Sequence, residues 1–233
     1  MQTIGLIGGM SWESTIPYYR IINESVKQKL GGLHSAKIVL YSVDFQEIER
    51  HQRAGDWAAA AQILGRAGSA LRSAGADFFL ICTNTMHKVA DEVQRAAGIP
   101  LLHVVDAVAV EVKEGGIGKV GLLGTRFTME QDFYRARLSG KGIESLIPNL
   151  ADRDVIHRVI YDELCLGKVR DQSRSAYRDI IQRLVCDGAE GIVLGCTEIA
   201  MLIGPQDSPV PIFDTTAIHA HAAAEYALGA EHE

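Results

Sequence analysis

The sequence lacks several features that mark specialised protein classes. It has no apolar run of about 20 residues, the length needed to cross a bilayer, so we expect no transmembrane helix. Its first residues show neither a basic region nor a small-residue cleavage site, and we expect no signal peptide there. Acidic and basic residues nearly balance, 29 against 23, and the net charge of −6 argues against a nucleic-acid or anionic-membrane partner.

Cysteine is also scarce. The four cysteines are scattered and form no CxxC pair; they are Cys82, Cys165, Cys186 and Cys196. This pattern argues against a disulfide framework or a zinc ribbon, and it predicts a reducing, cytoplasmic location. The eight histidines are dispersed as well and form no HExxH motif, so the sequence predicts no metal site.

The remaining composition is that of an ordinary globular chain. Hydrophobic residues make up 47% and charged residues 22% of the sequence. The 23 glycines and 6 prolines follow no period, which excludes collagen-like or low-complexity character. A chain of 233 residues buries a large enough core to need no disulfide or metal for stability.

Short apolar runs alternate with longer segments of helical periodicity. In the first half, we expect strands at residues 3–7, 37–42, 78–82 and 101–105, and helices at residues 12–30, 57–74 and 87–97. Alternation of this kind predicts an α/β fold, with a largely parallel sheet flanked by helices.

The second half repeats the first. KVGLLG, which begins at residue 119, matches TIGLIG, which begins at residue 3. GAEGIVLGCTE from residue 188 matches GADFFLICTNT from residue 75, and PVPIFDTT matches PLLHVVDA. Any two βα units look somewhat alike, but three matches in order favour internal duplication. We therefore expect two similar α/β domains, residues 1–115 and 116–233, related by a pseudo-twofold axis, with a C-terminal helix able to pack back on the first.

The repeat aligns Thr83 with Cys196, each directly after a buried strand. Ligands of parallel sheets bind beyond the carboxyl ends of the strands, so we expect the active site between the two domains, where these ends face each other. Inversion of a stereocentre needs one group to remove a proton and a second to deliver one to the opposite face. Thr83 and Cys196 are the candidates for these roles, and the backbone N–H groups that follow them are candidate carboxylate donors.

A glycine turn, Gly8-Gly9-Met10-Ser11, follows the first strand, where loops that bind phosphate or carboxylate occur. It matches neither GxGxxG nor the P-loop, and no acidic residue at the end of the second strand is placed to bind a ribose. We therefore favour carboxylate binding over dinucleotide binding at this turn.

These motifs resemble the cofactor-independent aspartate/glutamate racemase family. They are GLIGGMSWEST at residues 5–15, CTNTMH at 82–87 and GCTEI at 195–199, supported by PYYRIIN at 17–23, TMEQDFYR at 128–135 and FDTTAIHA at 213–220. The resemblance implies two similar α/β domains with the active site between them. It also implies catalysis without pyridoxal phosphate, metal or any other cofactor, and assembly as a homodimer.

The resemblance implies that Thr83 and Cys196 form the acid/base pair. The usual first-half motif of the family is Cys-Asn-Thr, whereas this sequence has Thr83-Asn84-Thr85. A pair of Thr83 and Cys196 resembles the L-aspartate/glutamate-specific racemase subgroup. Cys82 lies one residue early and is expected to point to the opposite face of its strand, into the core, where we also place Cys165 and Cys186. The implied substrate-binding residues are Met10, Gln52 in a loop over the substrate side chain, Asn84, Thr85, Thr125, Lys168 near the distal carboxylate, Thr197, Glu198, and His219 as an aid to Cys196.

The sequence thus predicts a racemase that interconverts L- and D-aspartate or glutamate by two-base proton transfer at the α-carbon. In this hypothesis Cys196 removes the proton of the L-enantiomer and Thr83 protonates the other face. Two alternatives stay open: a lyase or cis–trans isomerase of the same scaffold, of the malonate decarboxylase or maleate isomerase type, and a non-catalytic protein that binds small carboxylates. The expected partners are an acidic amino acid and a second copy of the chain, with no nucleic acid and no membrane.

Overall fold

The computed structural model describes residues 1–229. The chain forms two compact units, each with its own parallel sheet. Unit 1 comprises Met1–Val104 and the C-terminal segment from His219 onward, and unit 2 comprises Val105–Ile218. No helix in the described part of the chain combines the length and the apolar character that a membrane crossing requires.

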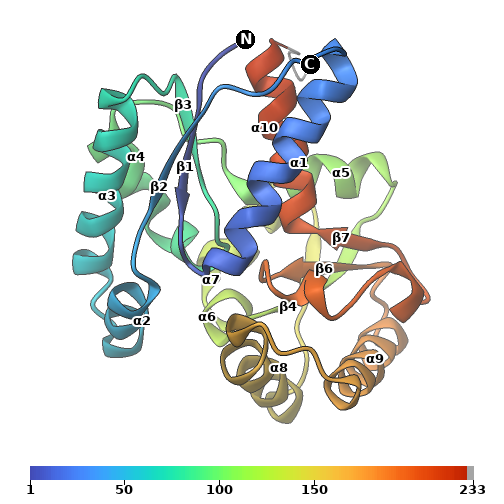
Figure 1. Cartoon of the computed structure of the whole chain (residues 1–233). Helices are drawn as coiled ribbons and strands as arrows, with labels where there is room; N and C mark the ends of the chain where they lie inside the picture. The colour runs from blue at the N-terminus through green and yellow to red at the C-terminus, as the bar shows by residue number, and fades with distance from the viewer. Residues whose placement is uncertain (230–233) are drawn as a thin grey trace. The chain divides into compact units, whose positions relative to one another are not determined.

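The sheet of unit 1 has three parallel strands in the order β2-β1-β3. Strand β1 (Ile4–Gly8) lies in the centre, between β2 (Ile38–Ser42) and β3 (Phe78–Ile81) (Figure 1). Side chains alternate between the two faces: Ile4 and Leu6 of β1 enter one core cluster, and the intervening positions face the other side. Both faces are apolar, as expected of a buried parallel sheet.

Helices α1 (Trp12–Leu30) and α10 (Thr215–Leu228) cover one face of this sheet (Figure 1). The part of α10 in unit 1 contributes a row of alanines, and α1 contributes Tyr18 and Ile22 to the same cluster. An ion pair between Lys29 and Glu225 joins the two helices at the surface. The C-terminal helix therefore packs on the first half, as the expected domain division allowed.

Three helices and a short 3-10 turn cover the other face. They are α2 (Phe45–Ala54), α3 (Trp57–Ser73), η1 (Thr85–Val89) and α4 (Ala90–Ala97). Asp44 and Asp56 cap the first two of these helices through their side chains. Helices α3 and α4 approach closely at Gly68, which has no side chain. A Cβ at this position would lie only 2.7 Å from that of Ala97.

The sheet of unit 2 has four parallel strands in the order β5-β4-β6-β7. They are β4 (Lys119–Gly124), β5 (Glu144–Leu146), β6 (Gly191–Gly195) and β7 (Ile212–Asp214). The flanking elements are α5 (Val104–Glu114), α6 (Arg126–Glu130), α7 (Asp132–Gly140), α8 (Leu150–Asp162), η2 (Leu164–Leu166), α9 (Asp171–Cys186), η3 (Ile199–Met201) and η4 (Pro205–Asp207). Helices α8 and α9 pack with β4 and β6 in one large core cluster.

The structure confirms the predicted α/β architecture, and the helix expected at residues 12–30 has those bounds. The strand expected at 101–105 is wrong: Leu101 forms only an isolated bridge to Phe79, and α5 begins at Val104. A short apolar run does not distinguish a strand from a buried helix start. Nearly all of helix α5 belongs to unit 2, so the boundary between the two units lies at 104/105, before the expected division at 115/116.

Candidate active site

The candidate residues of β3 lie in a tight turn at its carboxyl end. The N–H of Thr83 donates to the carbonyl of Ile81 at 2.8 Å, and Asn84 and Thr85 lead directly into η1. Thr83 is half-buried, whereas Asn84 and Thr85 are buried. Thr83, Asn84 and Thr85 thus form one continuous turn at the end of the strand.

His87, the third residue of η1, holds this turn in place. Its Nδ1 lies 2.8 Å from the carbonyl oxygen of Thr83. Because a carbonyl only accepts, Nδ1 carries the proton, and Nε2 accepts from the N–H of Val104 at 3.3 Å. His87 is therefore a neutral bridge that positions the backbone of Thr83.

Cys82 does not share this turn. Its side chain is fully buried in the cluster between the sheet and helices α1 and α10. Burial raises the pKa of its thiol far above the usual range, so it stays protonated and inert. The expectation that Cys82 points into the core is confirmed.

The glycine turn after β1 is bound to the start of α1. The N–H of Gly9 donates to Oγ1 of Thr15 at 2.9 Å, and Gly9 adopts a φ of 90°, where a Cβ would lie 2.2 Å from the carbonyl oxygen of Val43. Only glycine fits this position. Met10, the next residue, is buried in the core cluster on the α3 face of the sheet.

Gln52 lies in the last turn of α2, not in the loop that we expected. The helix was missed because its polar composition resembles that of a loop, and its amphipathic face gains stability only by packing. Gln52 is buried, and its Nε2 donates to Sδ of Met86 at 3.0 Å. Met86 and Met10 belong to the same core cluster. The structure therefore places the two predicted residues Gln52 and Met10 at one cluster.

His219 is fully buried in unit 1 and has partners on both ring nitrogens. Its Nε2 donates to the carbonyl of Leu102 at 2.8 Å, so its Nδ1 is the acceptor for the hydroxyl of Tyr18 at 3.0 Å. Burial lowers the pKa of the ring to about 4. These contacts make His219 a neutral residue of α10, and its expected role as an aid to Cys196, which belongs to unit 2, stays a prediction.

The chemistry of unit 2 gathers at the carboxyl end of β6. The thiol of Cys196 is buried and donates to Oε2 of Glu198 at 3.0 Å, and the hydroxyl of Thr197 donates to the same oxygen at 2.9 Å. Glu198 is itself buried. Desolvation, followed by the charge of Glu198, raises the pKa of Cys196 well above its usual value. The resting residue is therefore a neutral thiol next to a carboxylate that can accept its proton.

The neighbouring strands β4 and β6 bring Thr125 and Thr197 to the same edge of the sheet. Gly124 of β4 pairs with Gly195 of β6, so Thr125 and Cys196 directly follow paired positions. Thr125 caps α6 and accepts from the N–H of Thr128 at 3.3 Å. The expected second-half residues Thr125, Cys196, Thr197 and Glu198 thus occupy one edge of the sheet.

Thr216 also belongs to this edge, and sequence reasoning missed it. Leu194 of β6 pairs with Asp214 of β7, and Thr215 donates to the carbonyl of Leu194 at 2.8 Å. The next side chain, Thr216, is buried, and its hydroxyl has no hydrogen-bond partner among residues 1–229. The FDTT motif was visible in the sequence, but only burial distinguishes this threonine from its neighbours.

Lys168 lies apart from these buried groups. It follows η2 in an exposed segment, where its N–H donates to the carbonyl of Glu163 at 2.9 Å. Its side chain is exposed to solvent. Contact between Lys168 and a distal carboxylate stays a prediction.

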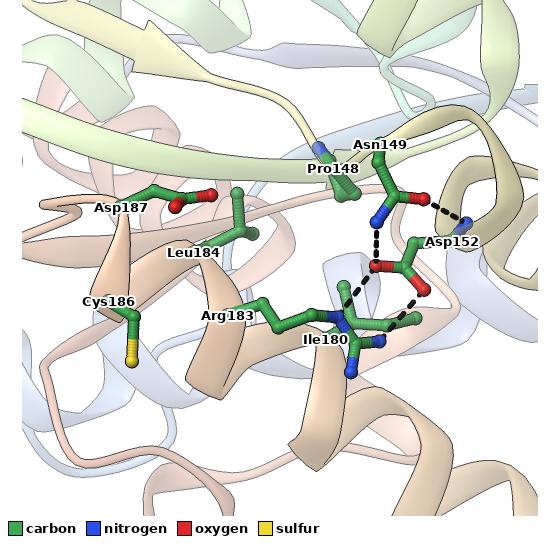
Figure 2. A pocket seen from close by; sticks show the side chains of 8 residues that line it. All are labelled: Pro148, Asn149, Asp152, Ile180, Arg183, Leu184, Cys186 and Asp187. Atoms are coloured by element: carbon green, nitrogen blue, oxygen red, sulfur yellow. Dashed lines mark hydrogen bonds and ion pairs between the residues drawn. The ribbon is translucent and has the colours of Figure 1, made fainter.

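A pocket of about 160 Å³ lies between α8 and α9 (Figure 2). Two of its charged groups pair with each other: Arg183 donates to both carboxylate oxygens of Asp152 at 2.8 Å. Cys186 lines this pocket and is exposed, so its expected place in the core is wrong. The pocket contains none of the predicted site residues. No group of three metal-ligating side chains occurs among residues 1–229.

Several known proteins are similar to this chain in sequence and fold. A crystal structure of an Asp/Glu racemase-type protein from Yersinia pestis is 61% identical, covers 98% of this chain and 100% of its own, and superposes with a TM-score of 0.91. An aspartate racemase homologue from Pyrococcus horikoshii is 36% identical, with a TM-score of 0.84 and coverage of 98% and 100%. The broad specificity amino-acid racemase RacX of Bacillus subtilis is 23% identical over 92% of this chain and 93% of its own length. The family model for Asp/Glu/hydantoin racemases matches residues 7–223. The chain therefore belongs to the Asp/Glu/hydantoin racemase family.

Proposed function

We propose that this protein racemises an acidic amino acid, aspartate or glutamate, by transferring protons at the α-carbon without an organic cofactor. The observation that carries the proposal is the buried pair of the Cys196 thiol and the Glu198 carboxylate. A thiol next to a proton acceptor is suited to remove a weakly acidic carbon-bound proton. The similar structures from Yersinia pestis and Pyrococcus horikoshii support the choice of acidic amino acids.

Cys196 begins as a thiol, so it needs to lose its proton before it acts as a base. In the proposed step, Glu198 accepts the Sγ proton, and the thiolate then removes the α-proton of the L-enantiomer. The electron pair of the broken C–H bond moves into the α-carboxylate. A thiol is a weaker acid than a carboxyl group in water, so this transfer is unfavourable, and burial of Cys196 adds to its cost. The ammonium group of a bound amino acid offsets part of this cost, because it stabilises the thiolate.

Thr83 delivers the second proton in this proposal. A threonine hydroxyl is a far weaker acid than a thiol, so it serves as a donor only if its oxygen regains a proton as it gives one away. Thr83 is half-buried, and solvent water can supply that proton. One proton then enters at Thr83 and one leaves from Glu198, so the enzyme returns to its starting state.

Thermodynamics limits what the Thr/Cys asymmetry can do. Free enantiomers have equal free energies in water, so the equilibrium constant of racemisation is one, and kcat/KM is equal in both directions. Thr83 cannot make the reaction one-way. It makes kcat and KM differ between the two enantiomers, with slower turnover of the D-enantiomer.

Exchange of the α-proton in heavy water tests the proposal. L-aspartate and L-glutamate are incubated with the wild type, with Cys196→Ala, and with Cys186→Ala, an exposed cysteine that serves as the matched control. We expect deuterium incorporation and loss of optical rotation with the wild type and the control, and neither with Cys196→Ala. Undiminished exchange in Cys196→Ala would refute the assignment. Release of carbon dioxide from malonates, or conversion of maleate without racemisation, would support the alternative lyase or isomerase.

A further inference from the structure

The carboxyl edge of the unit 2 sheet carries a buried hydroxyl that the described part of the chain does not satisfy. Thr216, in the first turn of α10, is 3% exposed, and its hydroxyl has no hydrogen-bond partner among residues 1–229. A buried hydroxyl without a partner costs free energy, because it has given up its hydrogen bonds to water. Such a group in a native structure indicates a functional role or a bound molecule.

The local fold around Thr216 is held by its neighbours and does not need this hydroxyl. Oδ1 of Asp214 accepts from the N–H of Thr216 at 2.9 Å and from the N–H of Ala217 at 3.4 Å. The hydroxyl of Thr215 ties the same turn to β6 through the carbonyl of Leu194. A threonine in a helix commonly donates to a carbonyl one turn earlier, but the hydroxyl of Thr216 makes no such bond.

The pairing of β6 with β7 places Thr216 at the same edge as Cys196. The last pair of this ladder is Leu194 and Asp214. Cys196 follows Leu194 by two residues, and Thr216 follows Asp214 by two residues. Ligands of parallel sheets bind beyond the carboxyl ends of the strands. The Thr216 hydroxyl therefore lies at the edge of unit 2 that carries the thiol, where a ligand can reach both groups.

We propose that Thr216 is a substrate-binding residue, whose hydroxyl donates a hydrogen bond to a carboxylate oxygen of the bound acidic amino acid. This inference rests on the proposed function, which supplies the ligand. A carboxylate only accepts hydrogen bonds and an ammonium group only donates them. The ammonium group has a stronger partner at this edge, the buried carboxylate of Glu198, so the hydroxyl serves the carboxylate of the ligand.

Loss of the hydroxyl is expected to change affinity and stability in opposite directions. A hydrogen bond to a charged group is stronger than one between neutral groups, so its removal weakens binding by about 10- to 100-fold. The same removal stabilises the ligand-free protein, because the unsatisfied hydroxyl is gone. A residue with only a structural role would show the reverse, a less stable protein with unchanged affinity.

Calorimetric titration with L-aspartate and L-glutamate tests the proposal in a Cys196→Ala background, where the proposed reaction does not proceed. Thr216→Val removes the hydroxyl and keeps the shape of the side chain, and Thr216→Ser keeps the hydroxyl. Ser208→Ala is the matched control, because Ser208 precedes β7 at the opposite end of that strand and donates to the carbonyl of Val210 at 2.7 Å. We expect about 10- to 100-fold weaker binding for Thr216→Val, and binding close to that of the parent for Thr216→Ser and the control.

Three results would overturn the proposal. Equal affinity of Thr216→Val and its parent would mean that a buried water satisfies the hydroxyl. An equal loss in Thr216→Ser would mean that the hydroxyl is not the cause, and a parent that binds neither amino acid would remove the ligand. Failure of the proposed function is distinct: the wild type would not exchange the α-proton, although Thr216→Val would still weaken binding. Failure of this inference alone would leave exchange intact, with an unchanged KM in Thr216→Val.

Discussion

Replacement of Glu198 by glutamine separates two effects of this residue on Cys196. The carboxylate lies 3.0 Å from the thiol sulfur, and its negative charge is one of the causes that raise the pKa of Cys196. Glutamine keeps the size of the side chain and removes the charge. Neighbouring charges at such distances shift a pKa by about 1–3 units, so we expect the pKa of Cys196 to fall by about that amount. Desolvation, the larger cause, remains in the variant.

The rate of alkylation by iodoacetamide as a function of pH measures this shift, because only the thiolate reacts. The experiment uses a Cys186→Ser background to remove the exposed thiol, and mass spectrometry follows the peptide that contains Cys196. Loss of a negative charge favours the thiolate, so the midpoint moves to lower pH. Glu190→Gln, which removes an exposed carboxylate elsewhere in unit 2, is the control and leaves the midpoint in place.

The rate of racemisation is expected to fall in Glu198→Gln, although the thiol of Cys196 becomes easier to ionise. Glutamine cannot accept the thiol proton, so Glu198→Gln lowers kcat although its thiol is more acidic. An unchanged or raised midpoint would refute the electrostatic reasoning. A lowered midpoint with undiminished turnover would show that Glu198 depresses thiolate formation without serving as the proton acceptor.

Three further outcomes follow from the described contacts. Thr83→Cys creates a pair of thiols, and we expect faster turnover of the D-enantiomer in a circular-dichroism assay; no gain contradicts the pKa argument for Thr83. Thr216→Val removes a buried hydroxyl without a partner, so urea unfolding of the ligand-free protein should show a gain of about 1 kcal/mol in stability, and a loss would mean that the hydroxyl is satisfied. His219 has a folded pKa of about 4, below its unfolded value of about 6.5, so stability is complete above the unfolded pKa and is lost as the pH falls towards the folded pKa. Between pH 7 and pH 5 this loss is about 2 kcal/mol, and His219→Gln should reduce it in urea unfolding at the two pH values.

The sequence alone determined the features that depend on local pattern. Alternating apolar runs and helical periods predicted the parallel α/β architecture and the bounds of α1, because side chains on one face of a strand or helix recur at a fixed spacing. Three matches in order between the halves aligned Thr83 with Cys196, each at a strand end. The one-residue offset of Cys82 was enough to direct its side chain into the core.

Tertiary structure decided whatever depends on which groups meet and what is removed from water. The apolar run at 101–105 pairs with the sheet at a single bridge and then enters helix α5, so it forms no strand. Packing brought the carboxylate of Glu198 next to the thiol of Cys196, and it bound both ring nitrogens of His219 to Tyr18 and Leu102. Periodicity predicts which face of a helix or strand is buried. The protonation state and the exposure of a side chain depend on which distant segments pack against it.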